Sequence, residues 1–312
     1  MQRRGMNVRK GILRLALPVL RALPPRTASR LLAGIGRTEY ALLPRLRLRL
    51  DAAIAREGHY FGSPWDVPLV GRDLAGNLIR GRTRDLLLDG QTLDRLESLF
   101  QVRGREVLDA ACRQGRGVIL LGNHFGAHML PGHWLIRQGY PYRLFGERPR
   151  HISRLQTRQY ALDGPLGQDK LFISRKANPA EAAGSILRAT RVLKAGMILH
   201  IAGDVRWSGP NTATATFLGR TYTFSNTWVI LAAMTAAPVV PVFCRMEPDG
   251  TNRLEFLPAL HVPPDASSAA AKTSPWVQAC LRTIEEKVQS DPANSNDYFF
   301  WTETPEFLAD AG

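Results

Sequence analysis

Two polar side chains follow apolar runs of the sequence and have the chemistry of a proton-transfer site. His124 comes just after the apolar run 118–122, in a turn that contains Gly126, and Asp204 comes directly after the run 197–203. A histidine can take a proton from a hydroxyl or an amine as a general base, and a carboxylate can orient its ring. The two positions therefore favour acid–base chemistry, although a single histidine is more often a packed or solvated residue.

Other kinds of site have weaker support. The three cysteines are far apart and none lies in a turn beside a histidine, so we expect neither a disulfide framework nor a cysteine nucleophile. His124 and His128 would share one helix face, but the H-E-x-x-H pattern is absent and Pro131 interrupts the approach to His133. There is no glycine-rich nucleotide-binding motif. We therefore expect no metal and no cofactor.

Short apolar runs alternate with helical patterns along the chain. Strands are predicted at 118–122, 142–146, 197–203, 238–244 and 253–257, and helices over most of 66–113 and at 179–195, 225–237 and 276–290. This alternation predicts an α/β fold in which a central mixed, mostly parallel sheet is flanked by helices. Ligands in such sheets bind beyond the carboxyl ends of the strands, where His124 and Asp204 are both expected.

Positive charge is concentrated at the start of the chain. Residues 1–50 contain twelve basic side chains and one acid, so they carry +11 of the net charge of +14. We therefore divide the chain into a basic amphipathic arm, residues 1–50, and a single α/β domain, residues 51–312. A nucleic-acid enzyme would more often spread its basic residues over the main groove, and no nucleic-acid partner is expected.

The arm has several possible roles. Its apolar stretch is too short to span a membrane, and Arg14 interrupts the pattern of a secretory signal. A basic amphipathic segment can lie on an anionic membrane, whereas an ordinary helix would pack on its own domain with a solvated basic face. A mitochondrial transit peptide is a weaker alternative. The Leu/Arg alternation at 43–50 is interpreted as part of a helix with arginines on one side.

Several short blocks occur in an order and spacing that resemble a known family. They are GRGVILLGNHFG at 115–126, IAGD at 201–204, FLGRTYT at 217–223, APVVPVF at 237–243, and Asp291-Pro292 followed by YFFW at 298–301. The sequence resembles the lysophospholipid acyltransferase superfamily. It is most similar to the lipid A late acyltransferases, which add acyl chains to a lipopolysaccharide precursor on the bacterial inner membrane. The resemblance covers most of residues 100–301.

The sequence departs from the family pattern at the catalytic motif. The family pattern places Asp or Glu five positions after the histidine, and that position holds Met129. Methionine cannot orient an imidazole as a carboxylate does. Asp204 or Glu147 could replace the missing acid, an easier nucleophile such as an amine could make the acid dispensable, or the site could be inactive and bind lipid only.

What the resemblance implies is a peripheral or monotopic acyltransferase on the cytoplasmic face of the bacterial inner membrane. It would move an acyl chain from an acyl carrier protein (ACP) or coenzyme A thioester to a hydroxyl or amine of a lipid or glycolipid. The alternative is an inactive lipid-binding or scaffold protein on the same fold. The catalytic candidates are His124, Asp204 and Arg158, and the substrate-binding candidates are Phe125, Gly126, Arg148, Gly219 and Arg220.

Two further features of the site follow from this interpretation. The oxyanion of an acyl-transfer reaction needs hydrogen-bond donors, for which the backbone N–H groups of the turn after His124 and an arginine are the candidates. Aromatic residues near the family-like blocks could line an acyl-chain pocket. Core packing is the better explanation for most of them, and Trp134 and Trp228 are assigned to the core.

Overall fold

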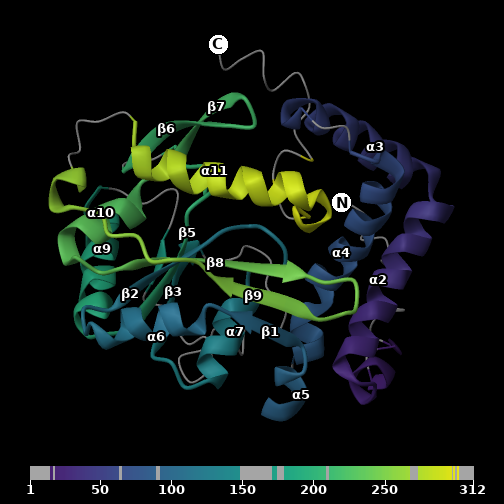
Figure 1. The fold of residues 1–312 in the computed structure, drawn as a ribbon, viewed down its shortest axis with the longest axis horizontal. Coiled ribbons are helices and arrows are strands. Elements are labelled where there is room, and N and C mark those ends of the chain that lie inside the picture. Colours follow the sequence, from purple (N-terminus) through teal and green to yellow (C-terminus); the bar gives the residue numbers. More distant parts are fainter. Residues whose placement is uncertain are drawn as a thin grey trace, which may run out of the picture.

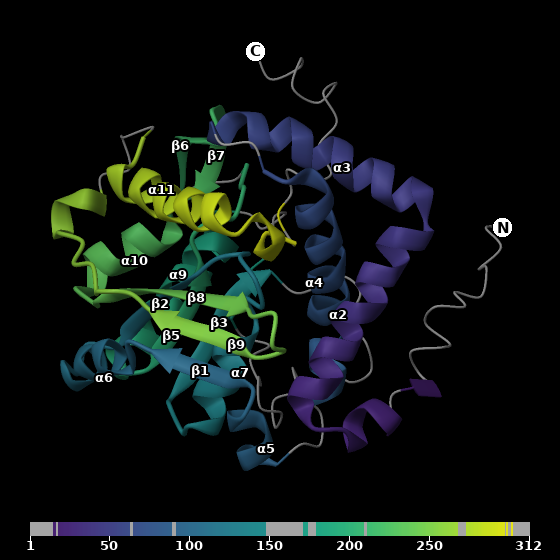
Figure 2. The ribbon, with the colours of Figure 1, turned by 45° about the vertical axis from the view of Figure 1, so that its right-hand side comes forward.

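The computed structural model describes residues 15–16, 18–62, 65–88, 92–147, 171–173, 179–208, 211–267, 273–296, 298 and 301. Within these residues the chain forms one large sheet with helices on both faces, and a separate two-stranded hairpin (Figures 1 and 2). The predicted fold class, a mixed and mostly parallel sheet flanked by helices, is confirmed.

The large sheet has seven strands in the order β1-β9-β8-β2-β5-β3-β4. Every neighbouring pair is parallel except β8 and β9, which are antiparallel. The bounds are β1 Phe100–Arg103, β2 Val118–Gly122, β3 Tyr142–Glu147, β4 Phe172–Ile173, β5 Ile198–Ala202, β8 Val239–Met246 and β9 Asn252–Phe256. The five predicted strands correspond to β2, β3, β5, β8 and β9.

The central strand β2 is buried on both faces, which explains its uninterrupted apolar sequence. Ile119 and Leu121 point into one core, together with residues of the helices α9 (Pro179–Lys194), α10 (Thr227–Thr235) and α11 (Pro275–Ser290). Val118 and Leu120 point into a second core, together with residues of α6 (Arg105–Arg113) and α7 (Leu130–Arg137). The alternation follows from the two-residue period of a strand. The result is a helix–sheet–helix sandwich (Figure 1).

Helices connect the parallel strands and cover both faces. The α-helices are α2 Pro25–Leu42, α3 Pro44–Gly58, α4 Val67–Leu88, α5 Leu93–Glu97, α6 Arg105–Arg113, α7 Leu130–Arg137, α9 Pro179–Lys194, α10 Thr227–Thr235 and α11 Pro275–Ser290. Three short 3₁₀ segments are η1 His59–Phe61, η2 Pro264–Ser267 and η3 Pro292–Asn294. The predicted helices at 179–195, 225–237 and 276–290 match α9, α10 and α11. Trp134 in α7 and Trp228 in α10 are both buried, as predicted.

The helices α2, α3 and α4 pack together along one side of the molecule (Figure 2). The Leu/Arg run at 43–50 is helical, as interpreted from the sequence, and it begins α3. The boundary predicted after residue 50 falls inside this helix, and Tyr40 before it donates a hydrogen bond to Asp51 after it. Residues 25–50 are thus continuous with the packing of the body. No described helix combines the length and hydrophobicity needed to cross a membrane.

Arg80 of α4 is buried and ties this helix layer to the sheet. Its guanidinium donates to the Ser29 hydroxyl at 3.0 Å and to the carbonyls of Glu247 at 2.9 Å and Thr251 at 3.0 Å. Burial lowers the pKa of Arg80 to about 10.

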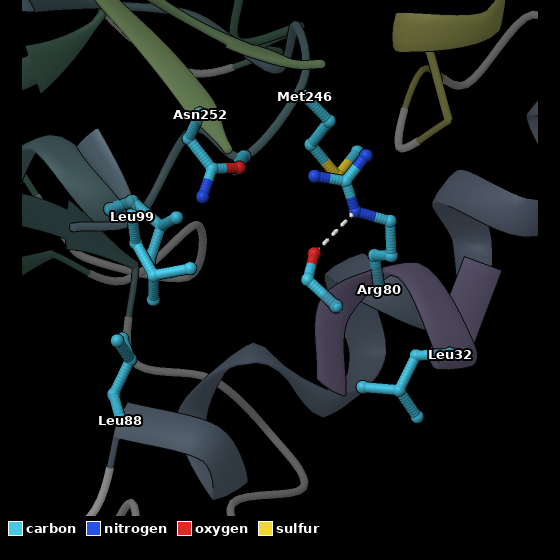
Figure 3. Close-up of a pocket in the computed structure, with 9 residues that line it drawn as sticks. Leu32, Arg80, Leu88, Leu99, Met246 and Asn252 are labelled. Atoms are coloured by element: carbon cyan, nitrogen blue, oxygen red, sulfur yellow. Dashed lines mark hydrogen bonds between the residues drawn. The ribbon is translucent and has the colours of Figure 1, made fainter. Parts of the chain in front are cut away.

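The guanidinium of Arg80 borders a cavity of about 30 Å³, across which Leu88 and Leu99 face Arg80 and Leu32 (Figure 3). A cavity of this size has room for about two water molecules, which is far too small for an acyl chain.

Three strand regions were not predicted from the sequence. The four-residue strand β1 lies within the stretch expected to be helical, and the two-residue strand β4 has no predicted counterpart. The strands β6 Thr212–Phe217 and β7 Arg220–Ser225 form an antiparallel hairpin beside the sheet. The hairpin turns at Leu218 and Gly219, which both have positive φ values, 52° and 69°. A leucine is unusual in that conformation, so the turn lacks the Asn-Gly, Asp-Gly or Gly-Gly pair by which two-residue hairpins are recognised.

Candidate active site

The candidate site lies at the carboxyl ends of two adjacent parallel strands. Gly122, the last residue of β2, pairs in register with Ala202, the last residue of β5. The residues that follow these strands, His124 and Asp204, therefore come out at the same edge of the sheet. This is the edge at which α/β proteins bind ligands, and the structure brings the two predicted catalytic residues together there.

Both oxygens of the Asp204 carboxylate bind His124. Oδ1 lies 2.8 Å from the ring atom Nδ1, and Oδ2 accepts the backbone N–H of His124, also at 2.8 Å. The Asp204 side chain is 1% exposed, whereas the His124 side chain is 37% exposed. A buried acid thus fixes both the backbone and the ring of a histidine that solvent or substrate can reach.

The electrostatics of the pair define which nitrogen can react. Burial by itself would raise the pKa of Asp204, but the charge of His124 and the hydrogen bonds from its ring and backbone outweigh it and hold the pKa below its ordinary value. An ionised carboxylate can only accept, so Nδ1 of His124 carries the proton. The other ring nitrogen, Nε2, then has the lone pair that a general base requires.

The backbone N–H groups beside His124 are already engaged. Phe125 donates its N–H to the Asn123 side chain at 2.9 Å, Gly126 donates to the Asn294 carbonyl at 2.5 Å, and Ala127 donates to the Cys244 carbonyl at 2.7 Å. The expectation that these groups would stabilise an oxyanion is therefore wrong for residues 124–127. Their hydrogen bonds instead hold the turn rigidly against β8 and η3.

Phe125 and Gly126 occupy structural positions. Phe125 is buried and packs edge-to-face on Phe243 of β8, with ring centroids 5.9 Å apart. Gly126 has φ +64°, and a Cβ atom there would lie 2.1 Å from the Cys244 carbonyl oxygen. Only glycine fits such a position. Packing therefore accounts for both residue types, and their roles in substrate binding stay predictions.

Arg220 makes an ion pair on the hairpin. Its Nη1 lies 3.2 Å from the Glu57 carboxylate of α3, and the guanidinium stacks over the Tyr60 ring at 4.4 Å. Both charged side chains are buried, with 10% and 0% exposure. The neighbouring Gly219 forms the hairpin turn beside Tyr60. Among the described residues, Arg220 thus anchors the hairpin to α3, and its predicted contact with substrate stays a prediction.

The remaining predicted residues are placed as follows. Arg148 and Arg158 lie outside the described residues. Glu147 ends β3, which is separated from β2 by β5, so it comes out one strand beyond Asp204. His124 and His128 do not share a helix face as expected, because α7 begins only at Leu130.

The two histidine rings are 5.1 Å apart, and no group of three metal-binding side chains occurs in the described part of the chain. A cysteine nucleophile has no support either, because burial raises the pKa of the Cys280 thiol, which interacts electrostatically with Asp204.

Three residues of the site were not singled out from the sequence. The Tyr298 ring lies nearly edge-on to the His124 ring, the Asn294 carbonyl accepts the N–H of Gly126, and the Cys280 sulfur lies beside Gly203. The family-like block at 298–301 contains Tyr298, but no spacing rule indicates that it reaches back to β2 and β5. Only the tertiary structure places these residues together.

Comparison with known proteins identifies the family of the chain. A family model described as bacterial lipid A biosynthesis acyltransferase matches residues 88–301. The match includes β2, β5, the hairpin and the block that contains Tyr298. A search of the curated proteins finds no similar sequence. Since the family match spans more than half of the chain and includes both His124 and Asp204, the chain belongs to the bacterial lipid A biosynthesis acyltransferase family.

Proposed function

We propose that this protein transfers a fatty acyl chain from an ACP or coenzyme A thioester to a hydroxyl or amine of a lipid or glycolipid, with His124 as general base. The observation that carries the proposal is the two-point contact of Asp204 with His124. It supplies from β5 the carboxylate that the family motif places at position 129. The methionine at that position is therefore compatible with activity.

The proposed reaction needs no covalent enzyme intermediate. Nε2 of His124 takes the proton of the acceptor as its oxygen or nitrogen attacks the thioester carbon. Asp204 stabilises the imidazolium that forms and keeps its ring in place. The tetrahedral intermediate then collapses, the carbon–sulfur bond breaks, and the imidazolium returns the proton to the departing thiolate. Because the N–H groups of residues 124–127 are engaged, the oxyanion would be stabilised by an arginine, for which Arg158 and Arg148 are the candidates.

The test is a transfer assay with the full-length protein. Wild type, His124→Ala and His261→Ala would each be incubated with acyl-ACP or acyl-coenzyme A and extracted bacterial lipids, and acylated products would be identified by mass spectrometry. His261 is a suitable control because it is exposed and follows Leu260, which pairs with the first residue of β8 at the opposite edge of the sheet.

We expect transfer by wild type and by His261→Ala, and a loss of about 10²–10⁴-fold in His124→Ala. Wild type that binds lipid but transfers no acyl chain from either donor would contradict the proposal. It would favour the inactive lipid-binding protein.

The corner between α2 and α3 is the proposed membrane contact. Leu42, Leu43 and Leu48 are exposed there, with Leu42 at 71%, and the exposed Arg45, Arg47 and Arg49 surround them. Apolar side chains among arginines match the interface of an anionic bilayer, where each basic residue contributes about 1 kcal/mol. The salt bridge from Glu57 connects α3 to the hairpin near the site.

Vesicle sedimentation tests this contact. We expect the full chain to bind vesicles that contain phosphatidylglycerol more strongly than vesicles of phosphatidylcholine alone. A triple variant, Leu42→Ser with Leu43→Ser and Leu48→Ser, should lose most of the binding. Leu187→Ser removes an equally exposed leucine from α9 and should bind as wild type does. Unchanged binding by the triple variant would show that the membrane is contacted elsewhere.

A further inference from the structure

A second histidine lies beside the proposed base. The rings of His124 and His128 have centroids 5.1 Å apart and are inclined at 46° to each other. Both residues are partly exposed, and Nδ1 of His128 is buried, which leaves Nε2 as the ring nitrogen of His128 that can meet a substrate. An acceptor oxygen bound to Nε2 of His124 lies about 3 Å from that atom, a distance comparable with the separation of the two rings. The proposed reaction would therefore take place next to the His128 ring.

The turn that carries His128 is held by backbone hydrogen bonds on both sides of this residue. The Ala127 N–H donates to the Cys244 carbonyl of β8 at 2.7 Å, and the Leu130 N–H donates to the Ala127 carbonyl at 2.8 Å. Leu130 is also the first residue of α7. The backbone of His128 is thus fixed between β8 and the start of a helix, so its ring stays beside that of His124.

The other described neighbours of the His124 ring are poorly placed to donate a hydrogen bond to a substrate. The Asp204 carboxylate is 1% exposed and only accepts. Tyr298 is buried, at 4% exposure. The backbone N–H groups of residues 124–127 are engaged within the protein. Among these groups, His128 is the one that combines a ring nitrogen able to donate with partial exposure at the site.

We propose that His128 is a further catalytic residue, whose Nε2–H donates a hydrogen bond to the oxyanion of the acyl-transfer intermediate. The inference rests on the proposed function and deepens it, because it assigns a donor to the oxyanion in addition to an arginine. When the acceptor attacks, the carbon–oxygen double bond of the thioester becomes a single bond and its electron pair moves to the oxygen. His128 stabilises that oxygen and keeps its own proton, while His124 takes the acceptor proton and returns it to the departing thiolate.

Two substitutions at His128 separate the hydrogen bond from the packing of the ring. His128→Leu removes the ring N–H, whereas His128→Gln keeps an N–H donor at the end of its side chain. His261→Leu is the matched control, because His261 is exposed and lies at the opposite edge of the sheet. Steady-state acyl transfer is measured with each full-length variant.

We expect kcat of His128→Leu to fall by about 10²–10³-fold, as when one oxyanion donor is lost, while KM stays within about threefold of wild type. His128→Gln should recover at least about tenfold of this loss, because an amide N–H can also donate. His261→Leu should match wild type. A kcat of His128→Leu equal to that of an active wild type would overturn the proposal.

A binding measurement tests the same hydrogen bond without turnover. The probes are two acyl-phosphopantetheine analogues, because ACP and coenzyme A share this arm. In the first, a difluoromethylene group replaces the sulfur, so the ketone is readily hydrated and becomes tetrahedral like the intermediate. In the second, a methylene group replaces the carbonyl, so the oxygen is absent. Isothermal titration calorimetry gives the Kd of both probes for wild type and for the His128 variants.

We expect wild type to bind the hydrated ketone more tightly than the thioether, and His128→Leu to lose about tenfold of this preference. No preference in wild type, or the same preference in His128→Leu, would overturn the role of His128. A wild type that transfers no acyl chain but has a preference that His128→Leu loses would contradict the proposed function and still support His128 as the donor to the oxyanion.

Discussion

The two ion pairs at the predicted site differ in what each leaves accessible. In His124–Asp204 the acid is 1% exposed and the base 37% exposed, whereas in Arg220–Glu57 both partners are buried, at 10% and 0%. The first pair has a carboxylate enclosed by donors and a ring nitrogen that can meet substrate. The second fastens the hairpin to α3 and presents no reactive atom. Burial of both partners indicates a structural pair, and exposure of one indicates a site that can do chemistry.

The largest effect is expected from a substitution that breaks the His124–Asp204 pair. Asp204→Asn replaces a carboxylate that only accepts hydrogen bonds with an amide that also donates, so Nδ1 of His124 loses its obligate acceptor. We expect kcat to fall by about 10³–10⁴-fold, as when the acid of a serine-protease triad is replaced by its amide. Urea unfolding should show a folded protein. Activity within tenfold of wild type would mean that Asp204 does not orient the base.

Breaking the second pair should affect stability instead. Glu57→Gln leaves the buried Arg220 guanidinium without its carboxylate, which costs about 3–5 kcal/mol of unfolding free energy. The control Glu255→Gln removes a half-exposed pair with Lys287 and should cost less than about 1 kcal/mol. Transfer activity per folded Glu57→Gln molecule should stay near that of wild type. A loss of activity without a loss of stability would indicate that Arg220 binds substrate and is not mainly structural.

The buried His200 sharpens the contrast with the exposed His124. Nδ1 of His200 in β5 shares a hydrogen bond with the Tyr142 hydroxyl at 2.8 Å. Burial lowers the pKa of His200 to about 4. Between pH 6.5 and 4 the unfolded chain binds a proton at His200 and the folded chain does not. Stability therefore falls as pH falls, by roughly 3 kcal/mol over this range.

Urea unfolding at pH 6.5 and pH 4 measures this loss. The double variant Tyr142→Phe with His200→Met replaces both partners by apolar groups. In this variant the part of the stability loss between pH 6.5 and pH 4 that we assign to His200 should be absent. An equal loss of stability in wild type and in the double variant would contradict the assignment to His200.

The smallest effect is expected at the position of the family acid. Met129→Glu restores the motif carboxylate, but Nδ1 of His124 already binds Asp204 at 2.8 Å. We expect kcat of the variant to stay within about 3-fold of wild type. The only ring N–H of neutral His124 is at Nδ1, and Asp204 already accepts it, so a carboxylate at position 129 has no ring N–H left to accept. Steady-state transfer assays with both thioester donors measure it. A gain of more than tenfold would show that the wild-type site lacks its acid.

The sequence was sufficient to predict that His124 and Asp204 lie at one edge of the sheet, because strand ends have a simple geometry. Two apolar runs followed by polar residues predict parallel strands whose carboxyl ends place His124 and Asp204 at one edge, whereas only the structure shows that β2 and β5 are neighbours. The hairpin escaped prediction because its turn uses Leu218 at positive φ. Tyr298 and Asn294 were not predicted, because their contacts with His124 and Gly126 depend on how the last segment folds back over the sheet.

The substrate-binding candidates show the opposite limit. Phe125, Gly126, Gly219 and Arg220 were selected through family-like blocks, and each has a packing or pairing role in the structure that accounts for its residue type. A family-like sequence block can be required for folding as well as for function. Without the contacts, the two reasons cannot be distinguished from one sequence.

The tautomer of His124 is the most direct test of the claim that Asp204 replaces the motif acid. The two ring nitrogens of histidine-labelled protein have distinct ¹⁵N shifts, which report the atom that carries the proton. At a pH at which the ring is neutral, we predict a proton on Nδ1 and none on Nε2 in wild type, and loss of this preference in Asp204→Asn. A neutral His124 with its proton on Nε2 in wild type would contradict the account, because that nitrogen could not accept the proton of an acyl acceptor.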